Sequence, residues 1–354
     1  MVQKEIVFIS NFLGNGGAAR VISILAEEFA ERNYSVCIYS FIGSGVKYEL
    51  NSKIKNLYIP TKKKKGLLSK FERILSIRRI IKAHPNATII SFEYFVNMQT
   101  IVASLGLQNK IIISERNDPM RRGGEFPLCL IRNFLYRLSN CLVCQTIDAQ
   151  KYFPPGIQKM SVIIENPLFN NLPNPYLGVR KKVIVNFCRI EKQKNLKLLI
   201  DAFKDFHVVH SEYNLKIYGD GNDYETIEKY ITENNASSYV HLHHGISNIH
   251  QEIIDSAMFV SSSNYEGLSN SMIEAMALGI PTIATDCPCG GARTIIKNEI
   301  NGILVPVGDK TEMVVAMNRI CSDETFAKKL SENAIKIRER LSVGKIASKW
   351  EKLL

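Results

Sequence analysis

The chain has 354 residues, of which 45% are hydrophobic and 22% are charged, a composition typical of a globular protein large enough for two domains. This composition excludes a disordered chain, a collagen and a small disulfide-stabilised scaffold. The formal net charge of +11 lies entirely in residues 1–175, which contain 23 Lys and Arg against 12 Asp and Glu, so we expect an anionic ligand or surface to contact the N-terminal half.

The first 14 residues contain one Lys before a short β-type run and no small-residue cleavage pattern, so we expect a first strand rather than a secretory signal, and a cytoplasmic protein. The most apolar stretch, residues 126–138, is interrupted by Arg132, Asn133 and Arg137 and is too short to span a bilayer. Membrane contact is therefore expected to be peripheral. The eight cysteines are interpreted as reduced thiols, because no pair of them has a second Cys or His pair at zinc spacing.

Short β-branched runs alternate with helix-length segments along the whole chain. The runs that predict strands are residues 5–10, 35–40, 54–59, 87–92, 110–115, 141–146, 161–166, 182–187, 215–220, 240–244, 258–263, 281–286 and 302–307. Most of them are apolar throughout, as strands are when crossover helices cover both faces of a parallel sheet. The pattern predicts an α/β protein with two doubly wound, Rossmann-like domains.

The domain boundary is predicted by a stretch rich in Pro and Asn that begins at Asn166 and cannot continue a helix or a strand. We expect an N-terminal domain over residues 1–168, a linker over 169–180 and a C-terminal domain over 181–354, whose last helix could pack back on the N-terminal domain. In open parallel sheets, ligands bind beyond the carboxyl ends of the strands. The loops after the strands are therefore where chemistry is expected.

The loop after the first strand contains Gly14, Gly16 and Gly17 and precedes a helical pattern from Val21 to Glu31. Such glycines let backbone N–H groups approach a ligand, and a helix start favours an anion such as phosphate. The spacing is not the dinucleotide fingerprint, because alanine replaces its last glycine. A tight structural turn explains the loop equally well.

Two cations follow the first strand of the second half. Arg189 and Lys194 lie in one loop before a helix, and at about 4 Å each would contribute roughly 4 kcal/mol to binding an anion at an effective dielectric near 20. A solvated basic loop is the alternative interpretation.

The next strand ends in Gly219, Asp220 and Gly221, a small loop suited to lining a nucleotide pocket.

A third loop carries carboxylates and a helix start. Ser269 to Ser271 predict an N-cap and first turn whose free amides can contact a diphosphate. Glu266 precedes this helix and can bind hydroxyl groups of a ligand. Glu274 lies about one turn inside the helix on an apolar face, so we expect it to be buried with a partner.

Taken together, these motifs closely resemble the retaining glycosyltransferases of family 4, which have the GT-B fold. The resemblance covers nearly the whole chain and rests on residues 16–26, Arg189 with Lys194-Asn195, Tyr218–Gly221, Glu266 with Glu274 eight positions on, Gly279–Asp286 and Asn301–Val305. Residues 114–119 and 286–293 resemble the branch that builds bacterial surface polysaccharides and lipid-linked oligosaccharides. Two departures are Cys188, where the family usually has Gly, and Ala292-Arg293, where many members have Glu.

The resemblance implies two Rossmann-like domains that face each other across a cleft, and transfer of a sugar from a nucleotide diphosphate, with UDP the expected nucleotide and with retention at the anomeric carbon. Glu266, Arg189, Lys194 and Glu115 are the implied catalytic residues; for Glu115 a salt bridge to Arg116 or Arg121 is an equally good interpretation. The expected donor-binding residues are Gly16, Gly17, Gly219, Asp220, Gly221, Gly267, Leu268, Ser269, Asn270 and Glu274, the last at the ribose. No Asp-x-Asp motif follows a strand, so no cofactor and metal-independent activity are expected.

The acceptor is predicted from charge. Residues 61–66 are rich in Lys and precede a basic helix that carries Leu67, Phe71, Ile74, Leu75 and Ile81 at helical spacing. Such a helix is typical of binding to anionic membranes, although a core-facing helix with a basic outer face remains the alternative. We expect a lipid-linked glycan acceptor, with an undecaprenyl diphosphate carrier, at the inner face of the cytoplasmic membrane. The expected contacts are Lys63, Lys64, Lys70, Arg73, Arg78, Arg121 and Arg122.

Two other classes of function compete with a transferase. A nucleotide-sugar epimerase or hydrolase of the same fold would release nucleotide without an acceptor. A nucleic-acid-binding protein would also use a basic half, but no binding motif or interleaved aromatic residues accompany the lysines, so no nucleic-acid partner is expected.

Overall fold

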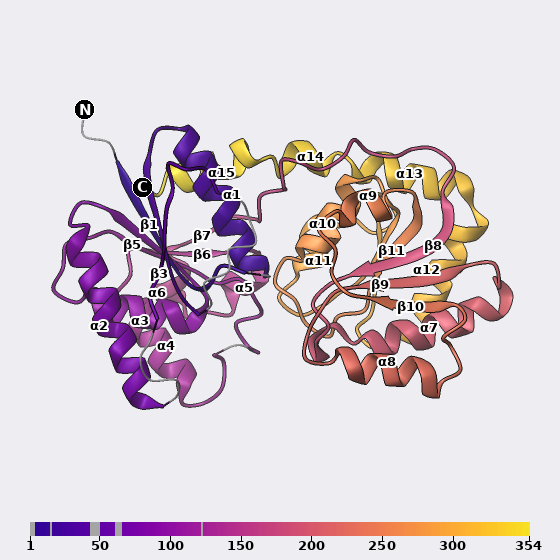
Figure 1. Ribbon diagram of the computed structural model, residues 1–354, viewed down its shortest axis with the longest axis horizontal. Helices are drawn as coiled ribbons and strands as arrows, with labels where there is room; N and C mark the ends of the chain where they lie inside the picture. The colour runs from indigo at the N-terminus through magenta and orange to yellow at the C-terminus, as the bar shows by residue number, and fades with distance from the viewer. Residues whose placement is uncertain (1–3, 15, 43–49, 61–65, 122) are drawn as a thin grey trace. The chain divides into compact units, whose positions relative to one another are not determined.

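The computed structural model describes residues 4–14, 16–42, 50–60, 66–121 and 123–354, which form two compact units. Unit 1 comprises residues 1–167 and 341–354, and unit 2 comprises residues 168–340. Each unit is a parallel sheet covered by helices on both faces (Figure 1). The prediction of two doubly wound α/β domains is confirmed.

Unit 1 contains a seven-stranded sheet in the order β3-β2-β1-β4-β5-β6-β7. Its strands are β1 (Glu5–Phe12), β2 (Ser35–Ile42), β3 (Lys55–Tyr58), β4 (Thr88–Phe92), β5 (Ile111–Ser114), β6 (Cys141–Cys144) and β7 (Ser161–Ile163). Its helices are α1 (Gly17–Glu31), α2 (Leu67–Ala83), α3 (Tyr94–Ser104), α4 (Leu128–Tyr136), α5 (Ile147–Lys151), α6 (Pro155–Gln158) and α15 (Val343–Glu351). The central strands are almost wholly buried, as their continuous apolar sequences predict.

Unit 2 contains a six-stranded sheet in the order β10-β9-β8-β11-β12-β13. Its strands are β8 (Lys181–Phe187), β9 (Asn214–Tyr218), β10 (Val240–His243), β11 (Ser256–Ser261), β12 (Thr282–Thr285) and β13 (Ile303–Val305). Its helices are α7 (Leu196–Val209), α8 (Tyr224–Glu233), α9 (Ile249–Ile253), α10 (Asn270–Ala277), α11 (Gly291–Ile295), α12 (Lys310–Ser322), α13 (Glu324–Ala334) and α14 (Ile337–Arg340), with a 3₁₀ turn η1 (Lys192–Lys194).

Both sheets reverse their strand order at one point. In unit 1 the chain builds outward from β1 to β3 and then returns to the other side of β1 with β4; in unit 2 the same reversal separates β8 from β11. Loops from the two strands at such a switch point diverge to opposite sides of the sheet and leave a crevice where ligands bind. The loops after β8 and β11 therefore mark the first place to look for chemistry in unit 2.

The last helix, α15, belongs to unit 1 although the sequence placed residues 181–354 in the second domain. Trp350 is fully buried and its ring stacks on Phe92 at 5.9 Å. Lys349 pairs with Glu165 at 2.6 Å, and Glu351 pairs with Arg32 of α1 at 2.7 Å. An apolar anchor flanked by ion pairs explains why this segment packs back on unit 1, an option that the sequence left open.

Candidate functional site

Two loops meet at the switch point of unit 2. After β8 the chain passes through η1 to Asn195, whose φ of 47° lies in the left-handed region, and enters α7. The loop from β11 lies against it: Ser262 Oγ donates to the carbonyl oxygens of Lys194 and Asn195 at 2.9 and 3.0 Å, and Asn264 N donates to Gln193 O at 2.9 Å. These backbone contacts fix the two loops as one rigid platform.

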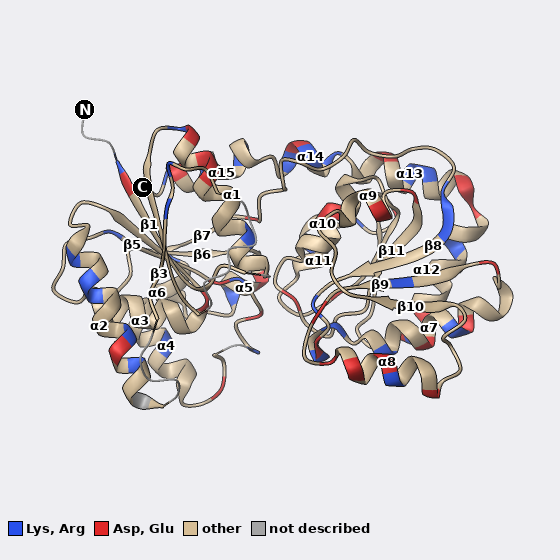
Figure 2. Cartoon of the chain, viewed as in Figure 1, with Lys and Arg blue, Asp and Glu red and all other residues tan. Residues whose placement is uncertain are grey.

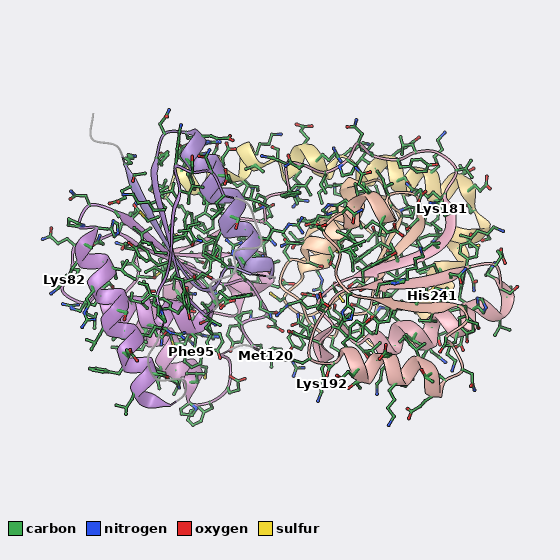
Figure 3. The ribbon with its side chains drawn as sticks, in the orientation of Figure 1. Lys82, Phe95, Met120, Lys181, Lys192 and His241 are labelled. Atoms are coloured by element: carbon green, nitrogen blue, oxygen red, sulfur yellow. The ribbon has the colours of Figure 1, made fainter. Side chains whose placement is uncertain are left out.

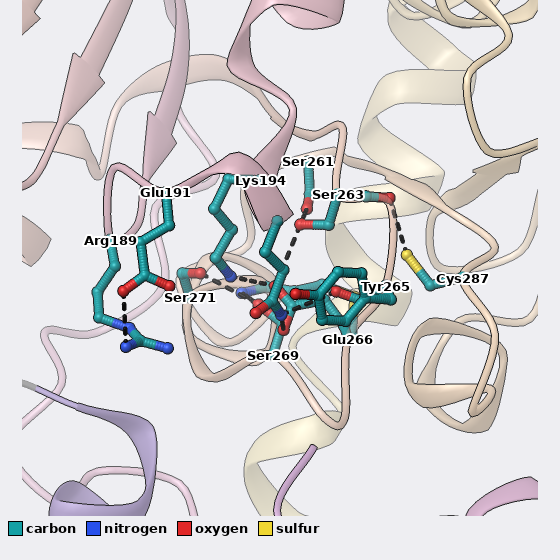
Figure 4. A network of polar contacts seen from close by, with 12 residues as sticks. Arg189, Glu191, Lys194, Ser261, Ser263, Tyr265, Glu266, Ser269, Ser271 and Cys287 are labelled. Atoms are coloured by element: carbon teal, nitrogen blue, oxygen red, sulfur yellow. Dashed lines mark hydrogen bonds and ion pairs between the residues drawn. The ribbon is translucent and has the colours of Figure 1, made fainter. Parts of the chain in front are cut away.

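Lys194 and Glu266 form an ion pair across this platform (Figure 4). Their side chains are only 13% and 15% exposed. The Glu266 carboxylate also accepts hydrogen bonds from Gln193 Nε2 at 3.1 Å and Ser263 Oγ at 3.1 Å. Burial alone lowers the pKa of the Lys194 amine, but the adjacent Glu266 carboxylate outweighs it, so the pKa lies above its ordinary value and the amine stays charged at neutral pH.

Arg189 lies in the same loop and is more accessible. Its side chain is 48% exposed, and its Nη1 pairs with Glu191 Oε1 at 3.0 Å. An exposed ion pair of this kind contributes little to stability, so Arg189 can exchange partners at small cost. The structure thus places both cations in the loop after β8, as the sequence predicted, with Lys194 largely buried and Arg189 about half exposed.

Helix α10 begins directly after the Glu266 loop. Ser269 is its N-cap, with Oγ accepting from Met272 N at 3.4 Å, so Asn270 and Ser271 occupy the first turn. A hollow at this point is lined by Ser261, Glu266, Gly267, Ser269, Met272, Ala284, Thr285, Cys287 and Ala292. A helix N-terminus that opens into a hollow beside Lys194 is suited to binding an anion.

Gly267 is held in place by a close backbone contact. A Cβ added to Gly291 at the start of α11 would lie 1.6 Å from the carbonyl oxygen of Gly267, and Gly290 before it has a φ of 69°. The Asp286–Arg293 segment therefore packs directly against the backbone of the Glu266 loop at Gly267. Its two glycines are required by packing, and Arg293 pairs with Asp286 at 2.6 Å.

Glu274 is buried, as its apolar helix face predicted. Its carboxylate and His250 Nε2 of α9 lie 2.8 Å apart in a hydrogen bond, and only 2% of the Glu274 side chain is exposed. The His250 ring is in turn packed against Phe169 and Phe187. The ribose-binding role remains a prediction.

The glycines after β9 serve the packing of two loops. A Cβ on Gly219, whose φ is 155°, would lie 1.8 Å from Cys188 O, and one on Gly221 would lie 2.2 Å from Ile190 O. Asp220 is exposed and pairs with His244 at 2.6 Å. Packing against the backbone of the loop after β8 therefore accounts for Gly219 and Gly221, and their nucleotide-lining role remains a prediction. Cys188, the departure from the family pattern, is half-buried, and burial raises the pKa of its thiol to about 12.

In unit 1, Gly16 and Gly17 begin α1. Gly16 has an extended backbone with a φ of 179°, and a Cβ there would meet open space. Neither steric space nor conformation requires glycine at position 16, whereas a Cβ on Gly14 would lie 1.9 Å from the Phe12 ring, so the tight-turn interpretation stays open for this loop. A donor contact by this loop remains a prediction.

Glu115 follows β5 and is buried in unit 1. Tyr136 of α4 donates a short hydrogen bond to its carboxylate, and Asn97 Nδ2 lies 3.3 Å from the same Tyr136 hydroxyl. Burial raises the pKa of Glu115 to about 7, although the Tyr136 hydrogen bond and the nearby Arg132 oppose the shift. The alternative pairing with Arg116 or Arg121 is thus replaced by a tyrosine partner from a helix that the sequence could not place.

The cations proposed for the acceptor divide into two sets. Arg73 donates to Asn11 at 2.8 Å and lies over the Phe41 ring, and Arg78 donates to the carbonyl oxygens of Ala103 and Leu105 at 2.8 Å. Both contacts are internal to unit 1 and both side chains are half-buried, and acceptor or membrane contact by Arg73 and Arg78 remains a prediction. Lys70 and Arg121 are exposed, whereas Lys63, Lys64 and Arg122 lie outside the described residues.

Sequence reasoning missed three side chains. Gln193 and Ser263 orient Glu266, and His250 pairs with Glu274. Gln193 and Ser263 could have been predicted as site residues because they lie in the loops after β8 and β11. Nothing in the local sequence distinguishes His250. A separate group, Glu5, Cys37 and His84 of unit 1, has ligand atoms within 4.8 Å of one another, and His84 bonds to Glu5 and Tyr39 at 2.8 Å.

Among the helices of the described residues, none is both long enough and apolar enough to cross a membrane.

Residues 174–337, which are almost all of unit 2, match the family described as Glycosyl transferases group 1. The fold of the whole chain is shared with Anabaena HepE in complex with UDP and glucose, at a TM-score of 0.85 and 18% identity over 99% of both chains. Residues 174–337 are therefore a glycosyltransferase group 1 domain, and the chain as a whole has the GT-B fold.

Two bacterial relatives align with this chain over almost their full length. One is a Campylobacter jejuni enzyme named GalNAc-alpha-(1->4)-GalNAc-alpha-(1->3)-diNAcBac-PP-undecaprenol alpha-1,4-N-acetyl-D-galactosaminyltransferase, 22% identical over 99% of this chain and 98% of that protein. The other is the amylovoran biosynthesis glycosyltransferase AmsD of Erwinia amylovora, 24% identical over 99% of both. The chain is therefore similar to proteins named for glycan assembly along its whole length, including unit 1.

Proposed function

We propose that this transferase moves a hexose or N-acetylhexosamine from a UDP-sugar to a lipid-linked glycan during bacterial polysaccharide biosynthesis, with retention at the anomeric carbon and without a metal ion. The observation that carries the proposal is the Lys194–Glu266 pair at the switch point of unit 2, beside the N-terminus of α10. UDP in the HepE structure and the undecaprenol-linked substrate in the name of the Campylobacter relative support the donor and acceptor classes.

The leaving diphosphate would be bound by cations and backbone amides. Lys194 supplies a charge held within the platform, Arg189 supplies an accessible one, and the first turn of α10 supplies N–H donors. As the bond from the anomeric carbon to the diphosphate oxygen breaks, negative charge accumulates on that oxygen. Groups already oriented toward this charge stabilise it without reorganising, and in many enzymes such preorganised groups provide most of the rate enhancement.

The remaining steps concern the sugar and the acceptor. Glu266, oriented by Gln193 and Ser263, would accept hydrogen bonds from sugar hydroxyls, and Glu274 would accept them from the ribose. The acceptor hydroxyl oxygen forms the new bond on the face that the diphosphate leaves, and its proton passes to the departing diphosphate. This balance requires no protein nucleophile.

A donor screen tests the proposal. Ligand at 100 times its dissociation constant stabilises a protein by about 2.7 kcal/mol, so thermal unfolding should respond most to UDP-sugars among UDP-, GDP- and ADP-sugars. Glu274→Gln should abolish the response. A larger response to GDP- or ADP-sugars would contradict the donor assignment.

Product analysis separates this function from its alternatives. With a lipid-linked acceptor, UDP release should match sugar transfer one to one, and the anomeric configuration of the product should equal that of the donor. Equal UDP release without acceptor would instead indicate a hydrolase. Full activity in the presence of a chelator is expected.

A further inference from the structure

Helix α4 of unit 1 exposes its apolar face. Leu130, Ile131 and Phe134 are 58%, 53% and 65% exposed, and Phe126 before the helix and Leu138 after it are 81% and 50% exposed. Residues 130, 131, 134 and 138 recur at helical spacing, so they form one stripe. A stripe of large apolar side chains in solvent is uncommon in a monomer and indicates a binding surface.

The opposite face of α4 explains why the stripe cannot turn inward. Arg132 is fully buried, with Nη1 donating to Pro119 O at 2.7 Å and its guanidinium about 5 Å from the ring centres of Tyr152 and Phe153. Tyr136, also fully buried, donates to Glu115. Rotating α4 to bury the stripe would expose these rings and break both hydrogen bonds. The outward direction of the stripe is therefore fixed by the core.

Helix α2 repeats the arrangement on the other side of α3, which packs against both α2 and α4 (Figure 1). Its Leu68, Phe71 and Leu75 are 62%, 61% and 39% exposed, whereas Ile77 and Ile81 on another face are buried. The structure thus combines the two alternatives left open for this helix, because α2 has a core-facing side and a separate apolar side in solvent. Phe71 and Leu75 are the residues of the predicted amphipathic pattern that lie on the solvent side.

Positive charges outnumber negative ones around these stripes, where the acidic residues are the half-buried Glu72 of α2 and the exposed Glu125 before α4. Lys70, Arg79 and Lys82 of α2 and Arg137 after α4 are exposed, and the sequence of α4 contains no Asp or Glu. Figure 3 shows Lys82 at the outer end of α2. Unit 1 as a whole contains 26 Lys and Arg against 13 Asp and Glu. A second copy of the same surface would be repelled by this charge, whereas anionic headgroups would be attracted to it.

We propose that the outer stripe of α4 inserts into the headgroup region of an anionic lipid bilayer, with the α2 stripe and the surrounding cations beside it. A short helix that lies in the interface buries its apolar face to a depth of about 5–10 Å, which suits the four side chains of the α4 stripe. The inference deepens the proposed function, because a transferase that uses a lipid-linked acceptor must work at a bilayer. It assigns the insertion to α4, a helix that the charge pattern of the sequence did not single out.

Vesicle flotation tests the proposal with the full chain. Wild type should float with vesicles containing phosphatidylglycerol, and the triple variant Leu130→Ser, Ile131→Ser, Phe134→Ser should bind them at least about tenfold more weakly. Val208→Ser on α7 of unit 2 removes one apolar side chain that is even more exposed, at 83%, and this variant should bind like wild type. Vesicles of phosphatidylcholine alone should bind wild type several-fold more weakly.

Two further readouts make each outcome decisive. UDP-induced thermal stabilisation of the triple variant reports that unit 2 is folded, and an unchanged unfolding midpoint without UDP reports that unit 1 is folded. Vesicle binding equal to wild type in the triple variant would overturn the proposal. Concentration-dependent dimers of wild type that the triple variant fails to form, with no vesicle binding, would assign the stripe to a second copy and also overturn it.

The proposed function fails independently of this inference. Vesicle binding that depends on α4, in a protein that transfers no sugar from any UDP-sugar, would support the α4 surface and contradict the acceptor assignment. Transfer to a lipid-linked acceptor by a protein that does not float with vesicles would support the proposed function and contradict the α4 surface.

Discussion

The two units share a sheet topology but differ in charge and in what they expose. Unit 1 carries a net charge of +13 and two apolar stripes in solvent, whereas unit 2 contains 19 Lys and Arg against 21 Asp and Glu, a net of −2, with its cations interspersed among acids (Figure 2). The family match covers unit 2 and not unit 1. The difference teaches that one sheet topology can carry a local, cross-linked polar site in one unit and a broad apolar and basic surface in the other.

The same contrast appears at the strand ends. In unit 2, the Glu266 carboxylate beside Lys194 outweighs the effect of burial and raises the pKa of the Lys194 amine. In unit 1, Glu115 lies among apolar and aromatic groups, and burial raises its pKa to about 7. A carboxylate after a strand is therefore paired with a cation in one unit and buried beside a tyrosine with a raised pKa in the other.

The largest expected effect would break unit 1 alone. Trp350→Ala should lower the free energy of unfolding of unit 1 by about 3–5 kcal/mol, because it removes a fully buried ring that joins α15 to the core. Thermal unfolding should then split into two transitions, with the UDP response confined to unit 2. Trp350→Phe is the matched control, and it should lower the free energy of unfolding of unit 1 by less than Trp350→Ala does. A single cooperative transition that shifts as a whole would contradict the independence of the units.

A substitution of Glu266 in the platform of unit 2 should lower catalytic activity and leave the stability of the fold nearly unchanged. Glu266→Gln should reduce kcat by about 10²–10³-fold, by analogy with the loss of one preorganised polar group at a reacting centre. Glu252→Gln on α9 removes another ion-paired carboxylate, bonded to Lys216 and Tyr218, and should stay within about twofold of wild type. Steady-state kinetics with a UDP-sugar and acceptor give the comparison. Equal losses of kcat in Glu266→Gln and Glu252→Gln would show that Glu266 has no special part in catalysis.

The buried carboxyl of unit 1 predicts a pH dependence of stability. The folded-state pKa of Glu115, about 7, lies above the ordinary value of 4.5, so the folded state binds more protons between these values. Its stabilising contribution is complete below pH 4.5 and is lost as pH rises through 7, a change of about 3 kcal/mol.

Glu115→Gln should remove this dependence. Urea unfolding of wild type and variant at pH 5 and pH 8 measures it, and the variant should gain stability relative to wild type at pH 8. Parallel curves for the two proteins across this range would show that Glu115 is ionised in the folded state.

The smallest effect concerns the support of the Glu266 loop. Gly291→Ala should cost about 1–3 kcal/mol and lower kcat, because its Cβ would overlap Gly267 O and displace the loop. Gly156→Ala in α6 of unit 1 meets open space and should be neutral or slightly stabilising. Differential scanning calorimetry of the two variants compares them directly. A neutral Gly291→Ala variant would mean that the loop adjusts freely.

Much of the fold could be predicted from sequence because buried parallel strands leave a strong local signal. Each of the predicted β-type runs corresponds to one strand, since continuous apolar runs such as 111–114 and 258–261 can only be buried on both faces. The positions of Arg189, Lys194 and Glu266 followed from the loop rule for parallel sheets. That rule depends on strand order alone, so it needs no knowledge of side-chain packing.

What could not be predicted depends on which helix face meets which neighbour. Arg73 and Arg78 look like surface cations in sequence, yet their guanidinium groups bond to Asn11 and to the last carbonyls of α3. Helix α4 is the clearest case, because its apolar residues face out and Arg132 faces in. Periodicity identifies the two faces of a helix but does not say which one packs on the core.

The central claim is that Lys194, together with the start of α10, binds the diphosphate of the donor. Isothermal titration of UDP and of uridine to wild type, Lys194→Ala and the exposed control Lys192→Ala tests it most directly, because only UDP carries the phosphates. We predict that Lys194→Ala weakens UDP binding by roughly 10–100-fold, as expected for a hydrogen bond to a charged group, and leaves uridine binding and the Lys192→Ala variant unchanged. Equal weakening of uridine and UDP, or no weakening of either, would contradict the account.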